Sequence, residues 1–201
     1  MSQVINYYHF LISPFSYLGM KQFDAMVSKH NLTVNYLPIA PMQVFSETGG
    51  VPPAKRHPSR QRLRMDELKR WSAHLNVPMN LTPAHFPADQ TLGAQMVLAA
   101  GGATGNPDAG KLVNALLTAV WAEEKNIADE DTLIACADGV GLSGSALLVS
   151  AKDDQWVKAY ASTTETAIET GVMGSPTYQL GEDLFWGQDR LDFLERALVS
   201  S

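Results

Sequence analysis

The sequence is poor in cysteine, with Cys136 as the single thiol among 201 residues. One cysteine excludes an intramolecular disulfide, a Cys-x-x-Cys redox pair and a cysteine-based metal cluster. The five histidines show no spacing typical of a metal site, so we expect no bound metal. Cys136 stands in an apolar helical stretch, where a thiol more often serves as a small buried hydrophobe than as a reactive group.

The sequence also lacks long apolar runs and any excess of basic residues. No stretch approaches the length of about 20 apolar residues that crosses a bilayer, and the first residues show no leader pattern. We therefore expect a cytoplasmic protein that does not interact with membranes. The net charge of −6, from 15 basic and 21 acidic residues, argues against a nucleic-acid partner. It leaves a small anionic ligand open, because a local pocket can be basic on an acidic protein.

Strand-like and helical segments alternate at the beginning of the chain. Residues 4–12 are rich in β-branched and aromatic side chains and predict a buried strand, which Ser13-Pro14 ends. Residues 15–31 follow with a helical apolar stripe, and residues 32–39 predict a second strand. This order is a βαβ unit, whose parallel strands need a right-handed crossover. An irregular loop is predicted over residues 46–62, and a helical pattern begins at its end and runs to Leu75.

The middle of the chain is helical in character, and its end returns to strands. Residues 88–170 predict helices with breaks at 101–107 and 139–144. Residues 176–180 and 184–186 predict a hairpin, and a closing helix follows over residues 189–198.

A βαβ half and a ββα half together make a thioredoxin-like core. The sequence therefore predicts an α/β fold in which a large all-helical insertion separates the two halves. The predicted thioredoxin-like domain comprises residues 1–45 and 171–201, and the loop and helical insertion comprise residues 46–170.

Ser13 stands at the junction between the first predicted strand and the first predicted helix. A helix N-terminus presents unpaired N–H groups and the positive end of the helix dipole, so it favours an anion. The hydroxyl of Ser13 is therefore placed to donate to a bound anion such as a thiolate. The alternative is that Ser13 only caps the helix, which is a common role for serine at this position.

Ser175-Pro176 begins the first strand of the predicted hairpin. A cis bond here would turn the backbone groups of Ser175 toward a peptide-like ligand, whereas a trans proline would only block an edge strand. Further along the chain, Asp189 is expected to cap the last helix, to accept the ammonium group of an amino-acid-like ligand, or both.

A cluster of basic residues lies in the loop after the second strand. A run of charge is usually a solvated face, but arginine also binds carboxylates bidentately. In an otherwise acidic chain, both a solvated surface and a carboxylate site stay open. The residues are Lys55, Arg56, His57, Arg60, Arg62 and Arg64.

Short motifs spread over nearly the whole chain point to a known family by their order and spacing. They are residues 7–18, 37–38, 49–53, 70–71, 85–87, 166–177 and 186–191. Together they resemble the 2-hydroxychromene-2-carboxylate isomerases and the related kappa-class glutathione transferases. These families form a branch of the disulfide-oxidoreductase-like thioredoxin superfamily.

The resemblance implies that the protein binds glutathione as its cofactor. Ser13 is similar to the serine that hydrogen-bonds the glutathione sulfur and so lowers the pKa of the thiol. Ser175, before Pro176, is similar to the residue whose backbone pairs with the cysteinyl part of glutathione. Gln188 and Asp189 are similar to the pair that holds the γ-glutamyl end.

The chain departs from the family pattern on the substrate side. Many relatives carry Asn-Lys before the double proline, where this chain has Gly50-Val51. The resemblance places Gly50, Val51, Arg60 and His85 at the substrate, with the basic loop binding a carboxylate. The glutathione residues therefore match the family better than the substrate residues do.

The resemblance implies a glutathione-dependent isomerisation in aromatic catabolism. In these isomerases the thiolate adds reversibly to a 2-hydroxychromene-2-carboxylate, opens a ring hemiketal and permits cis–trans rotation. A small aromatic carboxylate substrate and a homodimer are expected by analogy. The alternatives are a kappa-like glutathione transferase or peroxidase, and a non-catalytic thioredoxin-fold binding module in which Ser13 is only a cap.

Overall fold

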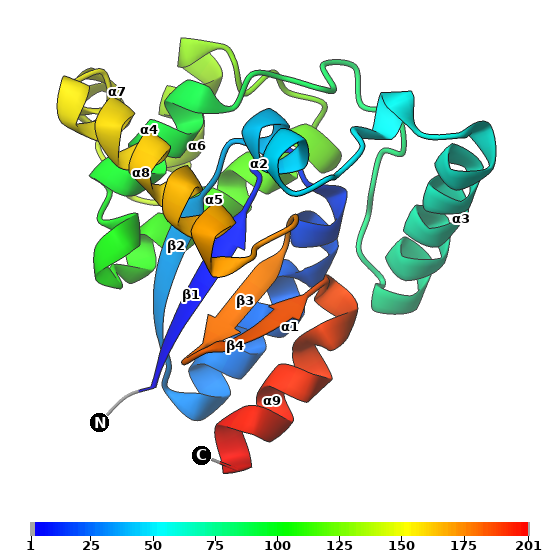
Figure 1. The fold of residues 1–201 in the computed structure, drawn as a ribbon. Helices are drawn as coiled ribbons and strands as arrows, with labels where there is room; N and C mark the ends of the chain where they lie inside the picture. Colours follow the sequence, from blue (N-terminus) through cyan, green and yellow to red (C-terminus); the bar gives the residue numbers. More distant parts are fainter. Residues whose placement is uncertain (1–2, 201) are drawn as a thin grey trace.

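The fold is built on one four-stranded mixed sheet, seen in a computed structural model that describes residues 3–200 (Figure 1). Strand β1 (Val4–His9) pairs in parallel with β2 (Thr33–Pro38) and antiparallel with β3 (Thr177–Leu180). Strand β3 pairs antiparallel with β4 (Asp183–Trp186), which gives the order β2-β1-β3-β4. The predicted thioredoxin-like core, with its βαβ and ββα halves joined through β1 and β3, is confirmed.

The register of the sheet places three tyrosines side by side at its centre. Tyr7 lies opposite Tyr36 on one neighbouring strand and opposite Tyr178 on the other. The Tyr7 ring stacks on Tyr178 with 5.0 Å between ring centroids and meets Tyr36 edge-on at 6.0 Å. All three side chains are buried on one face of the sheet, and Tyr8, the next residue of β1, is buried on the other face.

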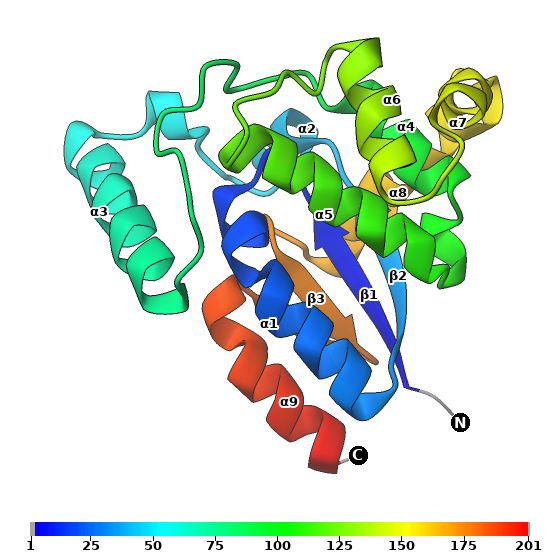
Figure 2. The same ribbon diagram turned by 180° about the vertical axis from the view of Figure 1, so that it is seen from behind.

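Helices cover both faces of the sheet. Helix α1 (Pro14–His30), helix α5 (Pro107–Trp121) and helix α9 (Leu191–Ser200) lie on one face (Figure 2), whereas α2 (Pro41–Glu47) and α8 (Asp154–Thr170) lie on the other (Figure 1). The beginning of α1 follows from local chemistry, because its first residue is a proline and the preceding serine accepts a hydrogen bond from the helix backbone. The two faces together bury the sheet.

The remaining helices of the insertion differ in how closely they join this core. Helix α4 (Thr91–Ala99) packs against β2, α5, α7 and α8, and α6 (Glu130–Gly139) packs against α5 and α7 (Gly144–Ala151). Helix α3 (Pro58–Leu75) lies at the side of the molecule next to α1 (Figures 1 and 2). The confirmed helical insertion thus wraps the core, and the exact domain limits stay a prediction.

Two local features differ from the sequence prediction. Helix α2 was not predicted, because its seven residues are too few to show a helical period. The irregular segment is shorter than the predicted loop over 46–62, since Pro53–Lys55 forms a 3-10 turn and α3 begins at Pro58. His57 caps α3 by accepting a hydrogen bond from the Ser59 N–H. Pro58 is favourable at the first helical position, so the helix begins there and not at Gln61.

Candidate active site

Ser13 lies where strand β1 gives way to helix α1, and it is buried. Its Oγ accepts a hydrogen bond from the Ser16 N–H at 3.2 Å and donates to the Ser175 carbonyl oxygen at 3.2 Å. The predicted helix cap is therefore present. The proton of the same hydroxyl is donated to Ser175, which is 162 residues away in the sequence. Ser13 therefore does more than cap the helix.

The Ser175 side chain forms hydrogen bonds both to the residue that follows β1 and to the first turn of α1. Its Oγ accepts from the Phe10 N–H at 2.8 Å and lies 2.8 Å from the Ser16 Oγ. The Ser175–Pro176 peptide bond is cis, which agrees with the first of the two alternatives for this proline. The hydroxyls of Ser13, Ser16 and Ser175 thus form one network, and two of them were singled out from the sequence.

Gln188 and Asp189 lie in a 3-10 turn that follows β4, and this turn is linked to the same region. The Gly187 N–H donates to the carbonyl oxygen of Pro176 at 2.8 Å. Gln188 is buried and packs against Gly19 of α1, and its Oε1 has no hydrogen-bond donor within residues 3–200. The partly exposed carboxylate of Asp189 lies 3.2 Å from the Arg190 guanidinium.

The last residue of β1 is a buried histidine. His9 has no exposed surface, and burial lowers its pKa to about 4. Its Nδ1 lies 3.1 Å from the Tyr7 carbonyl oxygen, which assigns the ring proton to Nδ1 and leaves Nε2 as an acceptor. That Nε2 has no partner within the described residues. The His9 ring stacks on Tyr7, so a neutral imidazole extends the aromatic stack of the sheet.

The predicted substrate residues form no hydrogen bond with the hydroxyl network of Ser13, Ser16 and Ser175 within residues 3–200. Arg60 and His85 are exposed, and within residues 3–200 their side chains form no hydrogen bond or ion pair. Val51 is also exposed, and its carbonyl oxygen accepts from Arg56 Nε. Gly50 is half-buried beside Phe45, and a Cβ added to it would lie 2.7 Å from the Phe45 ring. The substrate roles of these residues therefore stay predictions.

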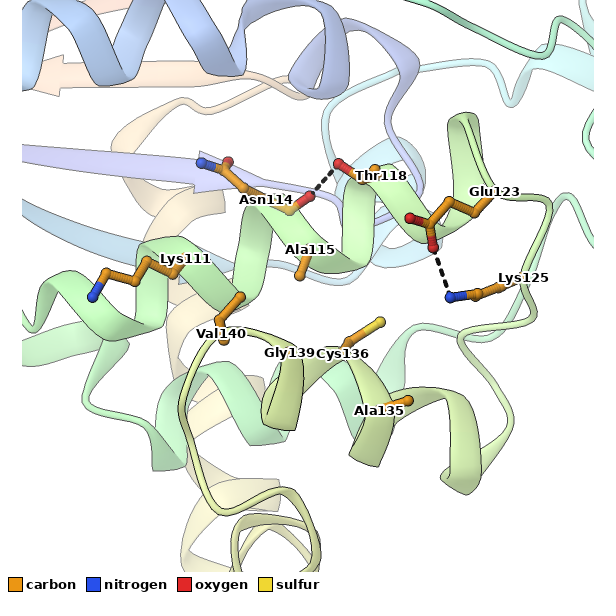
Figure 3. Close-up of a pocket in the computed structure, with 10 residues that line it drawn as sticks. All are labelled: Lys111, Asn114, Ala115, Thr118, Glu123, Lys125, Ala135, Cys136, Gly139 and Val140. Atoms are coloured by element: carbon orange, nitrogen blue, oxygen red, sulfur yellow. Dashed lines mark hydrogen bonds and ion pairs between the residues drawn. The ribbon is translucent and has the colours of Figure 1, made fainter.

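A separate cavity of about 520 Å³ lies between α5 and α6 (Figure 3). Cys136 points into it from α6, and burial raises the pKa of this thiol. Glu123 and Lys125 at its edge form an ion pair with 2.8 Å between the charged atoms. A protonated, largely buried thiol beside an already paired lysine fits the structural interpretation of Cys136 better than a reactive one.

Comparison with known proteins places this geometry in a family. The DSBA-like thioredoxin domain family matches residues 3–199. The chain is 30% identical over 200 residues to 2-hydroxychromene-2-carboxylate isomerase from Sphingobium xenophagum, covering 99% of this chain and 100% of that protein. The chain belongs to the 2-hydroxychromene-2-carboxylate isomerase family of DsbA-like thioredoxin domains. The family resemblance predicted from the sequence motifs is confirmed.

The chain is also similar to a kappa-class glutathione transferase and to a solved structure of the isomerase. Glutathione S-transferase kappa 1 from Caenorhabditis elegans is 24% identical over 200 residues, with 94% of this chain and 88% of that protein covered. A solved structure of 2-hydroxychromene-2-carboxylate isomerase superimposes with a TM-score of 0.82 at 26% identity, covering 98% of this chain and 95% of that chain. The full-length coverage means that core and insertion are shared together.

Sequence reasoning missed part of the hydroxyl network of this isomerase-family chain. Ser16 was seen only as part of a matching motif, and the Phe10 N–H was not considered. Neither carries a local signal, because their partner Ser175 is about 160 residues away and meets them only through the pairing of β1 with β3.

Within residues 3–200, no helix combines the length and apolar character needed to cross a bilayer.

Proposed function

We propose that this protein is a glutathione-dependent isomerase of a 2-hydroxychromene-2-carboxylate-type aromatic compound. The family membership supports the reaction class. The single observation that carries the cofactor is the position of the Ser13 hydroxyl, at the N-terminus of α1 and 3.2 Å from the Ser175 carbonyl oxygen. Cytoplasmic location and a homodimer stay predictions.

The residues of the site suit the chemistry of glutathione. Gln188 Oε1 is a buried acceptor that lacks a donor within the described residues, which suits an N–H or ammonium group of a ligand. The partly exposed carboxylate of Asp189 lies next to it and suits the α-ammonium group of the γ-glutamyl end. The Ser175 backbone, at the start of the β3 segment, suits a peptide-like cysteinyl unit.

The hydrogen bonds of Ser13 are arranged for exchange. Its Oγ keeps the bond accepted from the Ser16 N–H while its own proton turns from the Ser175 oxygen to a ligand sulfur. The Ser175 oxygen is then free to accept from the cysteinyl N–H of the ligand. No buried polar atom loses its partner in this exchange, so binding avoids the cost of an unsatisfied group.

The site lowers the pKa of a bound thiol for two reasons. The Ser13 hydroxyl donates to the charged form, and the N-terminus of α1 adds the positive end of the helix dipole. Bound glutathione would supply the nucleophilic thiolate and leave unconsumed at the end of the cycle. The protein's own residues therefore bind, orient and ionise a nucleophile that the chain itself lacks.

The decisive experiment replaces Ser13 with alanine. We expect kcat to fall by about 10²–10³-fold, as when one preorganised hydrogen-bond donor is lost. The thiolate absorbance of bound glutathione should titrate at a higher pH than in wild type. Ser16→Ala is the matched control, because it removes a neighbouring hydroxyl of the network and keeps that of Ser13. The control should lose about 1 kcal/mol of stability and keep the wild-type thiol pKa.

An unchanged thiolate titration in Ser13→Ala would remove the proposed role of this hydroxyl. The absence of any stabilisation of the wild type by millimolar glutathione would contradict the enzyme altogether and favour the non-catalytic binding module.

A kappa-like transferase or peroxidase is the second candidate, favoured by the kappa relatives and by Gly50-Val51, where many relatives of both kinds of enzyme are expected to carry Asn-Lys. The two activities differ in the fate of the thiol. Turnover of a hydroxychromene carboxylate without net loss of thiol supports the isomerase. Net consumption of thiol with an electrophile or a hydroperoxide supports the transferase.

A further inference from the structure

Two arginines at the beginning of α3 are held in place by contacts with neighbouring residues. Arg56, just before the helix, is held by a hydrogen bond from its Nε to the Val51 carbonyl oxygen at 2.7 Å. Arg64, in the second turn, lies over the Phe86 ring at 5.9 Å from its centroid. Both side chains are partly buried. Within residues 3–200, neither forms an ion pair with a carboxylate.

The electrostatics of this arginine pair are unfavourable in the free protein. Burial lowers the pKa of Arg64, and the nearby charge of Arg56 lowers it further. Burial also lowers the pKa of Arg56, with a second contribution from the charge of Arg60. Two partly buried like charges without a counterion are costly in a protein whose net charge is −6.

Helix α3 makes the repulsion stronger. The positive end of its dipole lies at Pro58, where acidic residues stabilise a helix, yet its first turn contains none. Arg56 and Arg60 lie on either side of this helix start. Partial burial, neighbouring like charges and the helix dipole all disfavour the arginine pair in the protein without a ligand. Such local conflicts are expected at functional sites, and a bound anion would relieve all three.

The geometry favours a planar anion with an apolar ring attached. Arginine presents a rigid fork of donors that matches a carboxylate. Phe86, next to Arg64, packs on the buried Trp121 with 5.1 Å between ring centroids, so the core holds its ring in place. Helix α3 contacts α1, and both views show it on the side of the molecule where α1 begins (Figures 1 and 2). Ser13 is the residue that precedes α1.

We propose that Arg56 and Arg64 form a carboxylate-binding subsite, with Phe86 as the wall for an attached aromatic ring. The assignment rests on the proposed function for the identity of the substrate. It narrows the carboxylate-binding role, which was predicted for the whole basic loop, to two arginines that are partly buried and fixed by contacts, whereas Arg60 is exposed. The glycyl carboxylate of glutathione has the same chemistry, so the test separates the two sources.

The test measures binding of chromone-2-carboxylate and of its neutral carboxamide by calorimetry, with glutathione present and absent. Wild type should bind the carboxylate at least about tenfold more tightly than the carboxamide. Arg56→Gln and Arg64→Gln should each reduce this ratio toward one. Arg62→Gln is the matched control, because its side chain is on the same helix, carries the same charge and is 87% exposed. The control should keep the wild-type ratio.

A second arm compares glutathione with its glycyl monoethyl ester. If the arginine variants lose affinity for glutathione and bind the ester as wild type does, the pair holds the glycyl carboxylate, and the substrate assignment is overturned. If the variants bind both glutathione forms as wild type does and lose only the chromone preference, the substrate assignment is supported. If Arg56→Gln and Arg64→Gln both keep the wild-type preference for the carboxylate over the carboxamide, the proposed subsite is overturned. The same conclusion follows if only Arg60→Gln loses that preference.

Stability distinguishes binding from a merely structural role. The ligand-free melting temperature of Arg64→Gln should stay within about 3 °C of wild type, because the change removes a repulsion along with one cation–π contact. The gain in melting temperature on adding the carboxylate should shrink in the same variant. A large loss of ligand-free stability with an unchanged ligand-dependent gain would assign Arg64 a structural role and overturn the subsite.

Failure of this proposal and failure of the proposed function give different results. If wild type turns over the hydroxychromene carboxylate and the arginine variants keep its KM, the subsite is wrong and the isomerase stands. If the arginines bind the carboxylate probe and wild type has no turnover, the isomerase is wrong and the subsite stands.

Discussion

The region around Ser13 and the segment over residues 49–64 are held in different ways. The Ser13 region is buried and joined by hydrogen bonds between residues about 160 positions apart. The segment 49–64 is largely exposed, and its side-chain hydrogen bonds reach no further than seven residues along the chain. The proposed cofactor side of the site is therefore part of the cooperative core, and the proposed substrate side lies largely on the surface, where a change disturbs the core less.

The two regions also differ in what a substitution would cost. Replacing Ser13 with an apolar residue leaves the Ser16 N–H without its partner, and replacing Ser175 leaves the Phe10 N–H without its partner. Val51 is 41% exposed, so a different side chain there costs little, whereas a side chain at Gly50 would meet the Phe45 ring.

The largest effect is expected at Gly19, where α1 meets the turn that carries Gln188. A Cβ at this position would lie 2.8 Å from Gln188 Cβ, which is not the free end of a flexible side chain. Gly19→Ala should therefore lose about 2–3 kcal/mol of unfolding free energy, measured in urea, and bind glutathione more weakly. Gly139→Ala is the control, because a Cβ there meets nothing within 4 Å. Equal stability of the two variants would show that the Ser13 region is not tightly packed.

The next effect is the pH dependence of stability from His9. Burial lowers the pKa of His9 in the folded protein to about 4, whereas its pKa in the unfolded chain is about 6.5. Between these pH values the unfolded chain therefore binds more protons than the folded protein does. The stabilisation is present above pH 6.5 and is lost as the pH falls toward 4. Wild type should lose about 2 kcal/mol between pH 7 and pH 5 from this group.

His9→Gln should remove that part of the pH dependence in urea unfolding curves, and His57→Gln in the exposed segment should keep it. An identical pH dependence in wild type and His9→Gln would show that the histidine is not buried as a neutral ring.

The smallest effect is expected within the segment itself. Leu63 is 56% exposed on α3, so Leu63→Ala should change the unfolding free energy by less than about 0.5 kcal/mol. Glutathione affinity should not change. A loss as large as that of Gly19→Ala would mean that α3 is covered in solution, and the contrast between the two regions would then fail.

Local patterns in the sequence predicted the elements well where the chain is strongly patterned. The strand before Ser13, the long helix after it and the C-terminal hairpin were all found, because each shows its period or its turn residues over enough positions. Helix α2 was missed, since seven residues cannot show a helical period. The start of α3 was placed three residues late, at Gln61 instead of Pro58.

The site was predicted unevenly for the same kind of reason. Ser13, Ser175 and Gln188 were singled out because they stand at junctions or match family motifs, and the fold brings their segments together. Arg56 and Arg64 could not be distinguished from Arg60 in the sequence. Helical spacing does not reveal which of several arginines is buried against Phe86 and which extends into solvent.

The sequence alone determined the chemistry that is available to this protein. With Cys136 as its only thiol, the chain cannot perform dithiol exchange, and a serine at the strand-to-helix junction can donate to a thiolate but cannot supply one. Only the tertiary structure decided which groups meet. Pairing of β3 beside β1 brings Ser175 to Ser13, because strand order is set by burial of the sheet between its helices and not by distance along the chain.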